Sequence, residues 1–400
     1  MPKHTLLVAE PGGDEPKVGA AIALSGGGFR AMLFHAGTLW RLGELGFFND
    51  RPLLRVDPQT GVSAPVGKLE RISSVSGGSI ASSVLAMSMG GLEALSGPAF
   101  AKEYERLVIG PIRRLAERNL AGTSAPSAWA VIRDVLMPGS VNDHVADTYN
   151  RALFNGQTLQ DLPDRIRFVF NASNLQSGAL WRFSKPYMRD WKVGEVKHPE
   201  LTLAKVVAAS SAFPPVLAPC MLKVADDDYT PGSGPLLQRP PFTTAPALAD
   251  GGVYDNLGLE TCFKRYLTLF VSNAGKPFEA KDGISKNWAS IGARCIDVMD
   301  NQVLAQRKSL LVEALKSQER TGAFWDIQQD IAVHHCPTPL PCPAQRTAEL
   351  AQVPTDLSRK PRELQERLIN WGYASADAAV RAWFNPTYPP GSFPYPNTRV

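Results

Sequence analysis

The sequence has few cysteines, little net charge and no long apolar run, and each absence excludes a class of protein. Five cysteines among 400 residues are few and odd in number, so a disulfide framework is excluded and we expect a reducing compartment. A formal net charge of +4 does not predict a nucleic-acid partner, although it is compatible with an anionic membrane surface. No segment reaches the roughly 20 apolar residues of a membrane-spanning helix, and residues 1–16 lack the apolar run of a signal peptide. We therefore expect a cytoplasmic protein that contacts membranes only from the surface.

Strand-like and helix-like segments alternate along the first two thirds of the chain. Apolar, β-rich stretches at 18–24, 165–172, 247–250 and 267–271 predict buried strands, and 180–183 is expected to pair with 165–172. Helical patterns cover 29–45, 80–89 and 203–212, and 100–153 reads as a helical region that could cover a cleft. This alternation predicts an α/β sheet. Further on we expect an amphipathic helix at 296–315 through Met299, Val303, Leu310 and Leu311, an irregular stretch at 334–361 and a helix pair at 363–384.

Three consecutive glycines follow the first predicted strand. Ser25, Gly26, Gly27, Gly28, Phe29 and Arg30 lead directly into the first predicted helix. Without Cβ atoms, the backbone N–H groups of such a turn can point into open space at the positive end of the helix. The turn therefore predicts an anion hole for either a bound phosphate or the oxyanion of an attacked ester.

A second tight turn carries a candidate nucleophile. Ser76 lies between a short apolar stretch and a predicted helix in the run Ser74, Val75, Ser76, Gly77, Gly78. This run resembles the Gly-x-Ser-x-Gly turn that exposes a serine hydroxyl at the end of a strand, with serine in place of the first glycine. A Ser-Gly-Gly turn alone also fits a plain helix N-cap. The upstream glycine turn favours the nucleophile.

A serine nucleophile needs a base, and Asp250 is the best placed carboxylate. It ends a predicted strand and precedes Gly251 and Gly252, so partial burial is expected to raise its basicity. Ser76, Asp250 and either His334 or His335 also follow the chain order of a serine, acid and histidine triad. Because no predicted strand precedes these histidines, we favour a dyad without histidine.

Taken with three further blocks, these turns resemble the bacterial patatin-like phospholipases. The further blocks are Phe-Asn-Ala-Ser-Asn-Leu-Gln-Ser-Gly, Ala-Ser-Ser-Ala-Phe-Pro-Pro and Ala-Asp-Gly-Gly-Val-Tyr-Asp-Asn, and the match runs in order over residues 18–260. The resemblance implies a three-layer α/β/α fold with a mainly parallel sheet and a helical cap. It also implies lipid acyl hydrolysis by Ser76 and Asp250, with Gly26, Gly27 and Gly28 as the oxyanion loop. The glycine run is similar to that of the cytosolic calcium-dependent phospholipases, whose arginine after the glycines is functional.

The resemblance sets the domain organisation and partners that we expect. Residues 1–17 form an extension, 18–272 a catalytic domain with a helical cap at about 98–153, and 273–400 a helical, proline-rich region packed on the same domain. The implied substrate is a phospholipid or another lipid ester, hydrolysed through an acyl-enzyme with no cofactor, with transient membrane contact and no nucleic acid. The alternative is a non-catalytic or regulatory module that holds a phosphate or acyl group. The oligomeric state is not predicted.

Several other residues have two interpretations. Arg30 matches the functional arginine and either binds a substrate phosphate or carboxylate, with Phe29 beside it, or pairs with an acidic side chain behind the loop. The cluster of His334, His335, Cys336 and Cys342 has no common zinc spacing, so we expect no metal. The remaining residues are assigned supporting roles: Asn171, Asn174, Ser210 and Ser211 around the site, Asp255 in the turn after Asp250, and His35, Phe324 and Trp325 in the core.

Overall fold

The structure is a computed structural model that describes residues 15–57, 60–120, 140–284 and 287–400. Its main sheet contains ten strands in the described part of the chain. They are β1 (Lys17–Leu24), β4 (Leu69–Val75), β5 (Arg167–Asn174), β6 (Ala179–Ser184), β7 (Tyr187–Asp190), β8 (Gly194–Lys197), β9 (Cys220–Met221), β10 (Ala247–Asp250), β11 (Tyr266–Asn273) and β12 (Thr321–Asp326). A separate hairpin pairs β2 (Leu54–Val56) with β3 (Ser63–Pro65).

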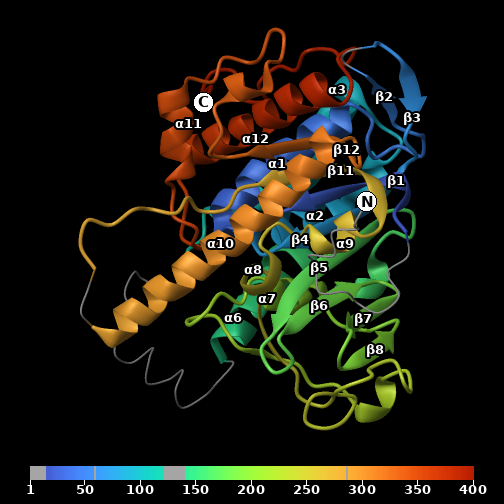
Figure 1. Cartoon of the computed structure of the whole chain (residues 1–400), viewed down its shortest axis with the longest axis vertical. Helices are drawn as coiled ribbons and strands as arrows, with labels where there is room; N and C mark the ends of the chain where they lie inside the picture. The colour runs from blue at the N-terminus through green and yellow to red at the C-terminus, as the bar shows by residue number, and fades with distance from the viewer. Residues whose placement is uncertain (1–14, 58–59, 121–139, 285–286) are drawn as a thin grey trace.

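The helices lie on both faces of this sheet (Figure 1). The α-helices are α1 (Gly28–Glu44), α2 (Gly77–Leu92), α3 (Gly97–Tyr104), α4 (Gly110–Ala116), α6 (Ser140–Tyr149), α7 (Leu203–Ser210), α8 (Gly252–Asp255), α9 (Glu260–Phe263), α10 (Trp288–Lys316), α11 (Ala344–Ala351) and α12 (Arg362–Trp383). Short π-helical stretches follow α3 and α6, at η1 (Glu105–Ile109) and η2 (Asn150–Phe154), and 3₁₀ turns occur at η3 (Leu159–Asp161), η4 (Asp226–Asp228) and η5 (Ile331–His334). The fold is the expected mixed α/β architecture.

The sheet is parallel where the candidate residues lie. Its order is β12-β11-β1-β4-β5-β6-β7-β8, and the pairs β12–β11, β11–β1, β1–β4 and β4–β5 are all parallel. From β5 onward the pairing is antiparallel, and β10 adds to β5 in the antiparallel sense. The carboxyl ends of β1 and β4 therefore lie side by side at one edge of the sheet.

Hydrophobic packing occupies both faces of the sheet. The larger core joins α1, α2 and α12 to one face, while a smaller core packs α9 and the C-terminal half of α10 on the other. Helix α1 is buried along nearly its whole length, as its apolar sequence predicts. Helices α3 and α4 contact α1 and α2. Whether the helical region covers a cleft stays a prediction, because part of it, 121–139, lies outside the described residues.

Two predictions for the C-terminal third are wrong in detail. The expected helix pair at 363–384 is a single helix, α12, because Gly372 serves close packing rather than a break: a Cβ there would lie 1.8 Å from the Phe34 carbonyl oxygen of α1. The irregular stretch at 334–361 contains α11. The predicted helix at 296–315 is confirmed as part of α10, although its apolar residues differ in burial: Leu311 is buried, whereas Met299 is 62% exposed.

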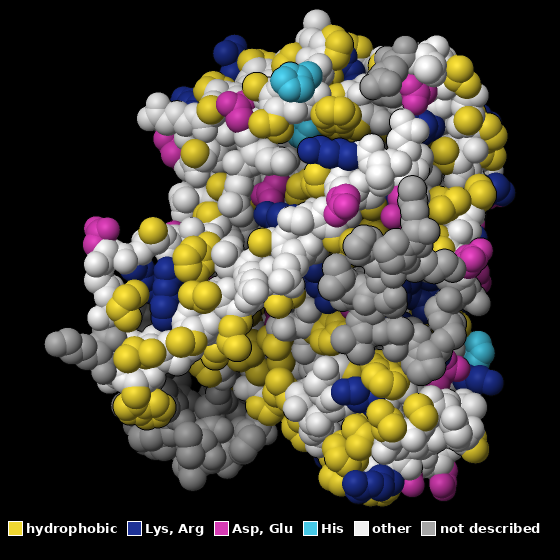
Figure 2. Space-filling model, in the orientation of Figure 1, with side chains coloured by type: hydrophobic (Ala, Val, Ile, Leu, Met, Phe, Trp, Pro, Cys, Tyr) yellow, Lys and Arg dark blue, Asp and Glu magenta, His cyan; other side chains and the backbone are white. Residues whose placement is uncertain are grey.

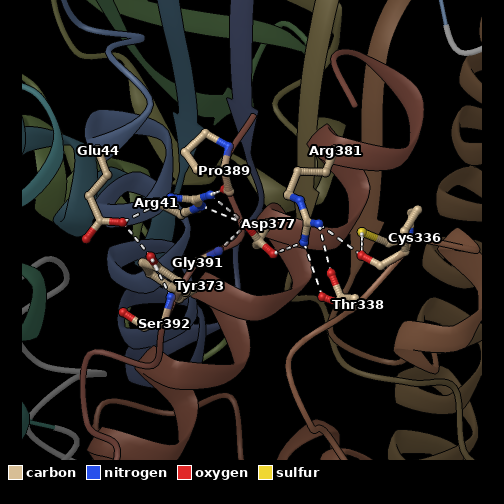
Figure 3. Close-up of polar contacts among 11 residues, drawn as sticks. Arg41, Glu44, Cys336, Thr338, Tyr373, Asp377, Arg381, Pro389, Gly391 and Ser392 are labelled. Carbon is tan, nitrogen blue, oxygen red and sulfur yellow. Dashed lines mark hydrogen bonds and ion pairs between the residues drawn. The ribbon is translucent and has the colours of Figure 1, made fainter. Parts of the chain in front are cut away.

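A buried ionic network joins α12 to α1 (Figure 3). Asp377 accepts hydrogen bonds from Arg41 Nε at 2.8 Å, from Arg381 Nη1 at 3.0 Å and from the Gly391 N–H at 3.1 Å. The side chain of Arg41 is 4% exposed and that of Asp377 is 1% exposed. We call residues 26–28 the glycine loop. The network therefore fixes the C-terminal region against α1, the helix that follows this loop.

Among the described residues, no helix combines the length and apolar character needed to cross a bilayer.

Candidate active site

The strand register brings Ser76 and Asp250 to the same place. Ser76 directly follows β4, whose last residue, Val75, pairs with Asn171 of β5. On the same edge of β5, opposite β6, Asp250 of β10 pairs with Ala172, the next residue along. The Ser76 side chain lies close enough to Asp250 to lower the pKa of that carboxyl by hydrogen bonding. Residues 174 positions apart in the sequence thus meet at the carboxyl edge of the parallel strands, where α/β folds commonly bind ligands.

Ser76 occupies a sharp turn between β4 and α2. Its φ of 51° and ψ of −119° depart from the regions that L-residues favour, and the residue is 7% exposed. The Ser76 N–H donates to Ser210 Oγ at 3.1 Å, and Ser210 Oγ donates to the Asn171 carbonyl at 2.7 Å. Ser210 therefore holds the turn, which is the supporting role predicted for Asn171 and Ser210.

Two glycines allow the turn to approach the glycine loop. A Cβ on Gly77 would lie 2.1 Å from the Gly28 carbonyl oxygen, and one on Gly78 would lie 2.7 Å from the carbonyls of Leu24 and Ser25. Side chains at either position would separate the two turns.

Burial changes the acidity of Asp250. The residue is 3% exposed, and this desolvation raises its pKa to about 6, opposed by hydrogen bonds from the Gly252 N–H and the Ser76 side chain. The Gly252 N–H donates to Oδ1 at 2.7 Å. The negative charge of Asp300 on α10 raises the pKa further. Asp250 is thus a stronger base than an ordinary aspartate while still ionised near neutral pH.

The three glycines of the loop differ in what their N–H groups do. The Gly26 N–H donates to the Asn256 carbonyl at 3.0 Å, so it is already used. Gly27 and Gly28 have φ values of 137° and 57°, which glycine adopts at little cost and which turn the backbone at the start of α1. A Cβ on Gly26 would lie 3.2 Å from Ser76 Cβ, so the loop adjoins the candidate nucleophile. The Gly27 and Gly28 N–H groups are therefore better candidates for oxyanion donors than that of Gly26.

Arg30 and Phe29 are completely buried behind the loop. Arg30 donates from Nη1 to the carbonyls of Ala351 at 2.6 Å and Val353 at 2.9 Å, and from Nη2 to the carbonyl of Ala274 at 2.7 Å. The partner is thus backbone, and not the acidic side chain that one interpretation expected. Both Nη atoms of Arg30 thus donate to backbone, Nε is buried without a partner among the described residues, and a substrate role for either residue stays a prediction.

The C-terminal region lies directly against the glycine loop, which the sequence did not indicate. We call residues 351–357 the crossing segment. The Phe29 N–H donates to the Asp356 carbonyl at 2.9 Å, and a Cβ on Gly28 would lie 2.4 Å from the same oxygen. Together with Arg30, these contacts fix the backbone that carries the candidate oxyanion donors.

The histidines lie apart from the pair. His334 is buried, accepts a hydrogen bond from Trp383 Nε1 at 3.3 Å, and has a pKa lowered to about 4 by burial. His35 bonds to the Ser25 carbonyl and Ser272 Oγ, each at 3.0 Å, as expected of a core residue. In the described part of the chain, no contact joins a histidine to Ser76 or Asp250. The geometry favours the dyad over the triad.

Several neighbouring residues support the site. Asp255 accepts from the N–H groups of Leu257 and Glu260, at 3.2 and 2.8 Å, so it supports the turn after Asp250 as predicted. Tyr149 and Ser211 were not singled out as a pair; their hydroxyls are hydrogen-bonded to each other at 3.4 Å. Burial, with a smaller contribution from the charge of Asp250, raises the pKa of Tyr149. No cluster of three or more potential metal ligands occurs among residues that the structure describes.

Comparisons with known proteins show a family match and similar solved structures. A family model described as "Patatin-like phospholipase" matches residues 22–263. Human GIVD cytosolic phospholipase A2 is similar in structure, with 13% identity, a TM-score of 0.47, and coverage of 90% of this chain and 58% of the human one. VipD from Legionella pneumophila has 15% identity and a TM-score of 0.31, with 85% of this chain and 66% of that chain covered. The chain thus spans less than two thirds of either protein's length. No curated protein sequence matches it.

Proposed function

The chain belongs to the patatin-like phospholipase family, which supports lipid acyl hydrolase activity, and we propose that it cleaves fatty acyl esters of phospholipids or lysophospholipids through Ser76 and Asp250. One observation carries the proposal: the side chain of Ser76, in a strained turn beside the glycine loop, adjoins a buried carboxylate whose pKa is raised to about 6. In this proposal Ser76 is the nucleophile, Asp250 is the base and the glycine loop supplies the oxyanion donors.

In the proposed first half-reaction, Asp250 accepts the Ser76 hydroxyl proton as Oγ bonds to the ester carbonyl carbon. The negative charge that develops on the carbonyl oxygen is stabilised by the N–H groups of Gly27 and Gly28; loss of one such donor costs about 2.7–4 kcal/mol of barrier. The carbon–oxygen bond to the leaving alcohol then breaks, and Asp250 returns its proton to that alcohol. The product is an acyl-enzyme on Ser76.

The second half-reaction uses the same groups. Asp250 accepts a proton from a water molecule, whose oxygen bonds to the acyl carbon. The bond to Ser76 Oγ breaks, Asp250 returns the proton to Oγ, and the fatty acid leaves. The charge and position of Asp250 are the same at the end as at the start, so no cofactor takes part.

The test removes each member of the pair separately. Ser76→Ala is expected to abolish hydrolysis of both phospholipid and p-nitrophenyl butyrate, and Asp250→Asn to lower it by about 10²- to 10⁴-fold. Ser83→Ala is the matched control, because Ser83 is also a buried serine of α2 but donates to the Ile80 carbonyl. Circular dichroism checks the fold of each variant.

Covalent labelling separates the alternatives. A fluorophosphonate probe, mapped by mass spectrometry, is expected to modify Ser76 in the unmodified protein and not in Ser76→Ala. Full activity of either pair variant would exclude the dyad. Complete loss in a correctly folded His334→Ala or His335→Ala variant would support the triad, and the absence of any labelling would favour a non-catalytic phosphate- or acyl-binding module.

A further inference from the structure

Helix α10 consists of two halves with different surroundings. In the C-terminal half, Leu311 and Ala314 are buried against the small core beside β11. In the N-terminal half, every described side chain from 287 to 303 is exposed except that of Arg294. This half projects from the body of the molecule over about four turns (Figure 1). A projecting helix of this length makes few contacts that could stabilise it in isolation.

The exposed half is amphipathic. With about 100° per residue, its large apolar side chains fall within a sector of about 160°, and none of its described charged residues enters that sector. These side chains are Trp288, Ile291, Ile296, Val298, Met299 and Val303, with exposures of 84%, 39%, 67%, 48%, 62% and 42%. Hydrophobic side chains gather over this end of the helix in Figure 2. We call these six side chains the α10 apolar face.

The projecting half begins at the candidate active site. Asp300 acts electrostatically on Asp250, so this part of α10 lies near the catalytic carboxylate. About two turns later, Arg307 donates to the Tyr254 carbonyl of α8 at 3.4 Å. Near Asp250 in the chain, Val253 is 54% exposed. Phe213 is 66% exposed, and it follows Ala212, whose carbonyl accepts the Asp250 N–H. Apolar side chains are therefore exposed next to the site as well as on α10.

We propose that the α10 apolar face inserts into the surface of a lipid bilayer and so brings the Ser76 and Asp250 site to its substrate. The inference rests on the proposed function for the identity of the substrate. The sector of about 160° is wider than the apolar seam through which coiled-coil helices pack. A heptad pattern along this helix also ends after about two heptads, where the polar Gln302 would lie in the seam. A second copy of the helix therefore fits the face poorly. An amphipathic helix of this kind lies in the plane of a membrane interface.

The charge of the projecting half selects the kind of lipid. Its described charged residues are Arg294, Asp297 and Asp300, which together do not attract an anionic surface. Binding must then come from apolar insertion rather than from counterion release. The partner is therefore a zwitterionic surface such as phosphatidylcholine, and the binding should depend little on salt.

The experiment measures vesicle binding apart from catalysis. Full-length Ser76→Ala protein is sedimented with phosphatidylcholine vesicles, with and without the further substitutions Ile296→Ser and Met299→Ser. Removing the two apolar side chains is expected to weaken vesicle binding at least about tenfold. The matched control is Val62→Ser with Val333→Ser, two substitutions of valines that are 64% and 46% exposed outside α10, and it should bind as Ser76→Ala does.

Hydrolysis is then compared in protein with Ser76 intact. The Ile296→Ser, Met299→Ser variant should lose hydrolysis of vesicle phospholipid while keeping that of dissolved p-nitrophenyl butyrate within about twofold. If the unsubstituted protein hydrolyses neither ester but its vesicle binding depends on the α10 apolar face, the docking inference stands and the proposed function fails.

Three outcomes would overturn the docking inference. They are equal vesicle binding with and without the two α10 substitutions, binding only to vesicles that contain phosphatidylserine with a steep salt dependence, and a dimer in solution that the same substitutions convert to a monomer. The last result would assign the face to a second copy of the chain.

Discussion

Ser76 has a strained backbone conformation, and this conformation directs its side chain toward Asp250. Its φ of 51° and ψ of −119° cost about 1–3 kcal/mol relative to relaxed backbone, and Gly77 and Gly78 make the conformation sterically possible. In return, the hydroxyl is directed to Asp250 instead of capping the N–H groups at the start of α2, where no side-chain cap is formed. The side chain is thereby kept available for reaction.

The raised pKa of Asp250 predicts the pH dependence of hydrolysis. Asp250 must be ionised to accept the Ser76 proton, so activity is lost as pH falls through its pKa of about 6. For an uncharged ester, kcat/KM should decline about tenfold per pH unit below that value and level off above it. A pH–rate profile with p-nitrophenyl butyrate measures this decline, which is the acidic limb of the profile.

Asp300→Asn provides the internal control for that profile. Because the charge of Asp300 raises the pKa of Asp250, its removal should move the acidic limb to lower pH without abolishing activity. A limb near pH 4 in the unsubstituted protein would instead match an ordinary aspartate and would contradict the raised pKa of Asp250.

The candidate pair could be predicted from sequence because local patterns mark both residues. Each lies where an apolar stretch ends and glycines begin, and the register of β4, β5 and β10 then brings them together. The partners of Arg30 could not be predicted in this way. They are backbone carbonyls, two of them more than 300 positions away, and carbonyls are present at every residue, so no side-chain pattern identifies them.

At the scale of elements, the glycine loop and the crossing segment form one unit. Arg30 and the Phe29 N–H both donate to carbonyls of the crossing segment, at Ala351, Val353 and Asp356. A guanidinium can satisfy several carbonyls at once, whereas an ammonium cannot reproduce this planar arrangement. The geometry thus assigns Arg30 a positioning role in this structure.

Arg30→Lys distinguishes that role from phosphate binding. If Arg30 positions the loop, the substitution should lower kcat on phospholipid and on neutral p-nitrophenyl butyrate by a similar factor, up to about a hundredfold. Hydrogen exchange should become faster in the crossing segment. A phosphate-binding role would instead raise KM for the phospholipid alone and leave exchange unchanged.

The elements that were not predicted correctly from the sequence depend on tertiary packing. Periodicity correctly predicted a helix at 296–315, yet it could not show that the sheet reaches only the C-terminal half and leaves Met299 exposed. Strand β12 was not predicted, although Trp325 within it is buried as expected. Gly372 has no local signal that separates a helix break from the close approach of α12 to α1.

For the whole molecule, the ionic network between α1 and α12 should contribute to stability. Asp377→Ala leaves Arg41 and Arg381 buried without their shared carboxylate, and removing one partner of a buried ion pair typically costs about 3–5 kcal/mol. The free energy of unfolding, measured with urea, should fall by that amount. Glu103→Ala, which breaks the more exposed pair with Arg106, is the control and should change it by less than about 1 kcal/mol. Equal changes in the free energy of unfolding for Asp377→Ala and Glu103→Ala would contradict a stabilising role for the buried network.

The crossing segment also sets the order in which the site can be assembled on the ribosome. The chain order places the glycine loop and Ser76 first, Asp250 next, and the carbonyls that hold Arg30 and Phe29 about 100 residues after Asp250. Domains form from the N-terminus as the chain emerges, but contacts with later residues must wait. A nascent chain without the crossing segment therefore has Ser76 and Asp250 but lacks the backbone contacts that fix the glycine loop. Under the proposed function, we expect hydrolysis to begin only after the crossing segment has emerged from the ribosome.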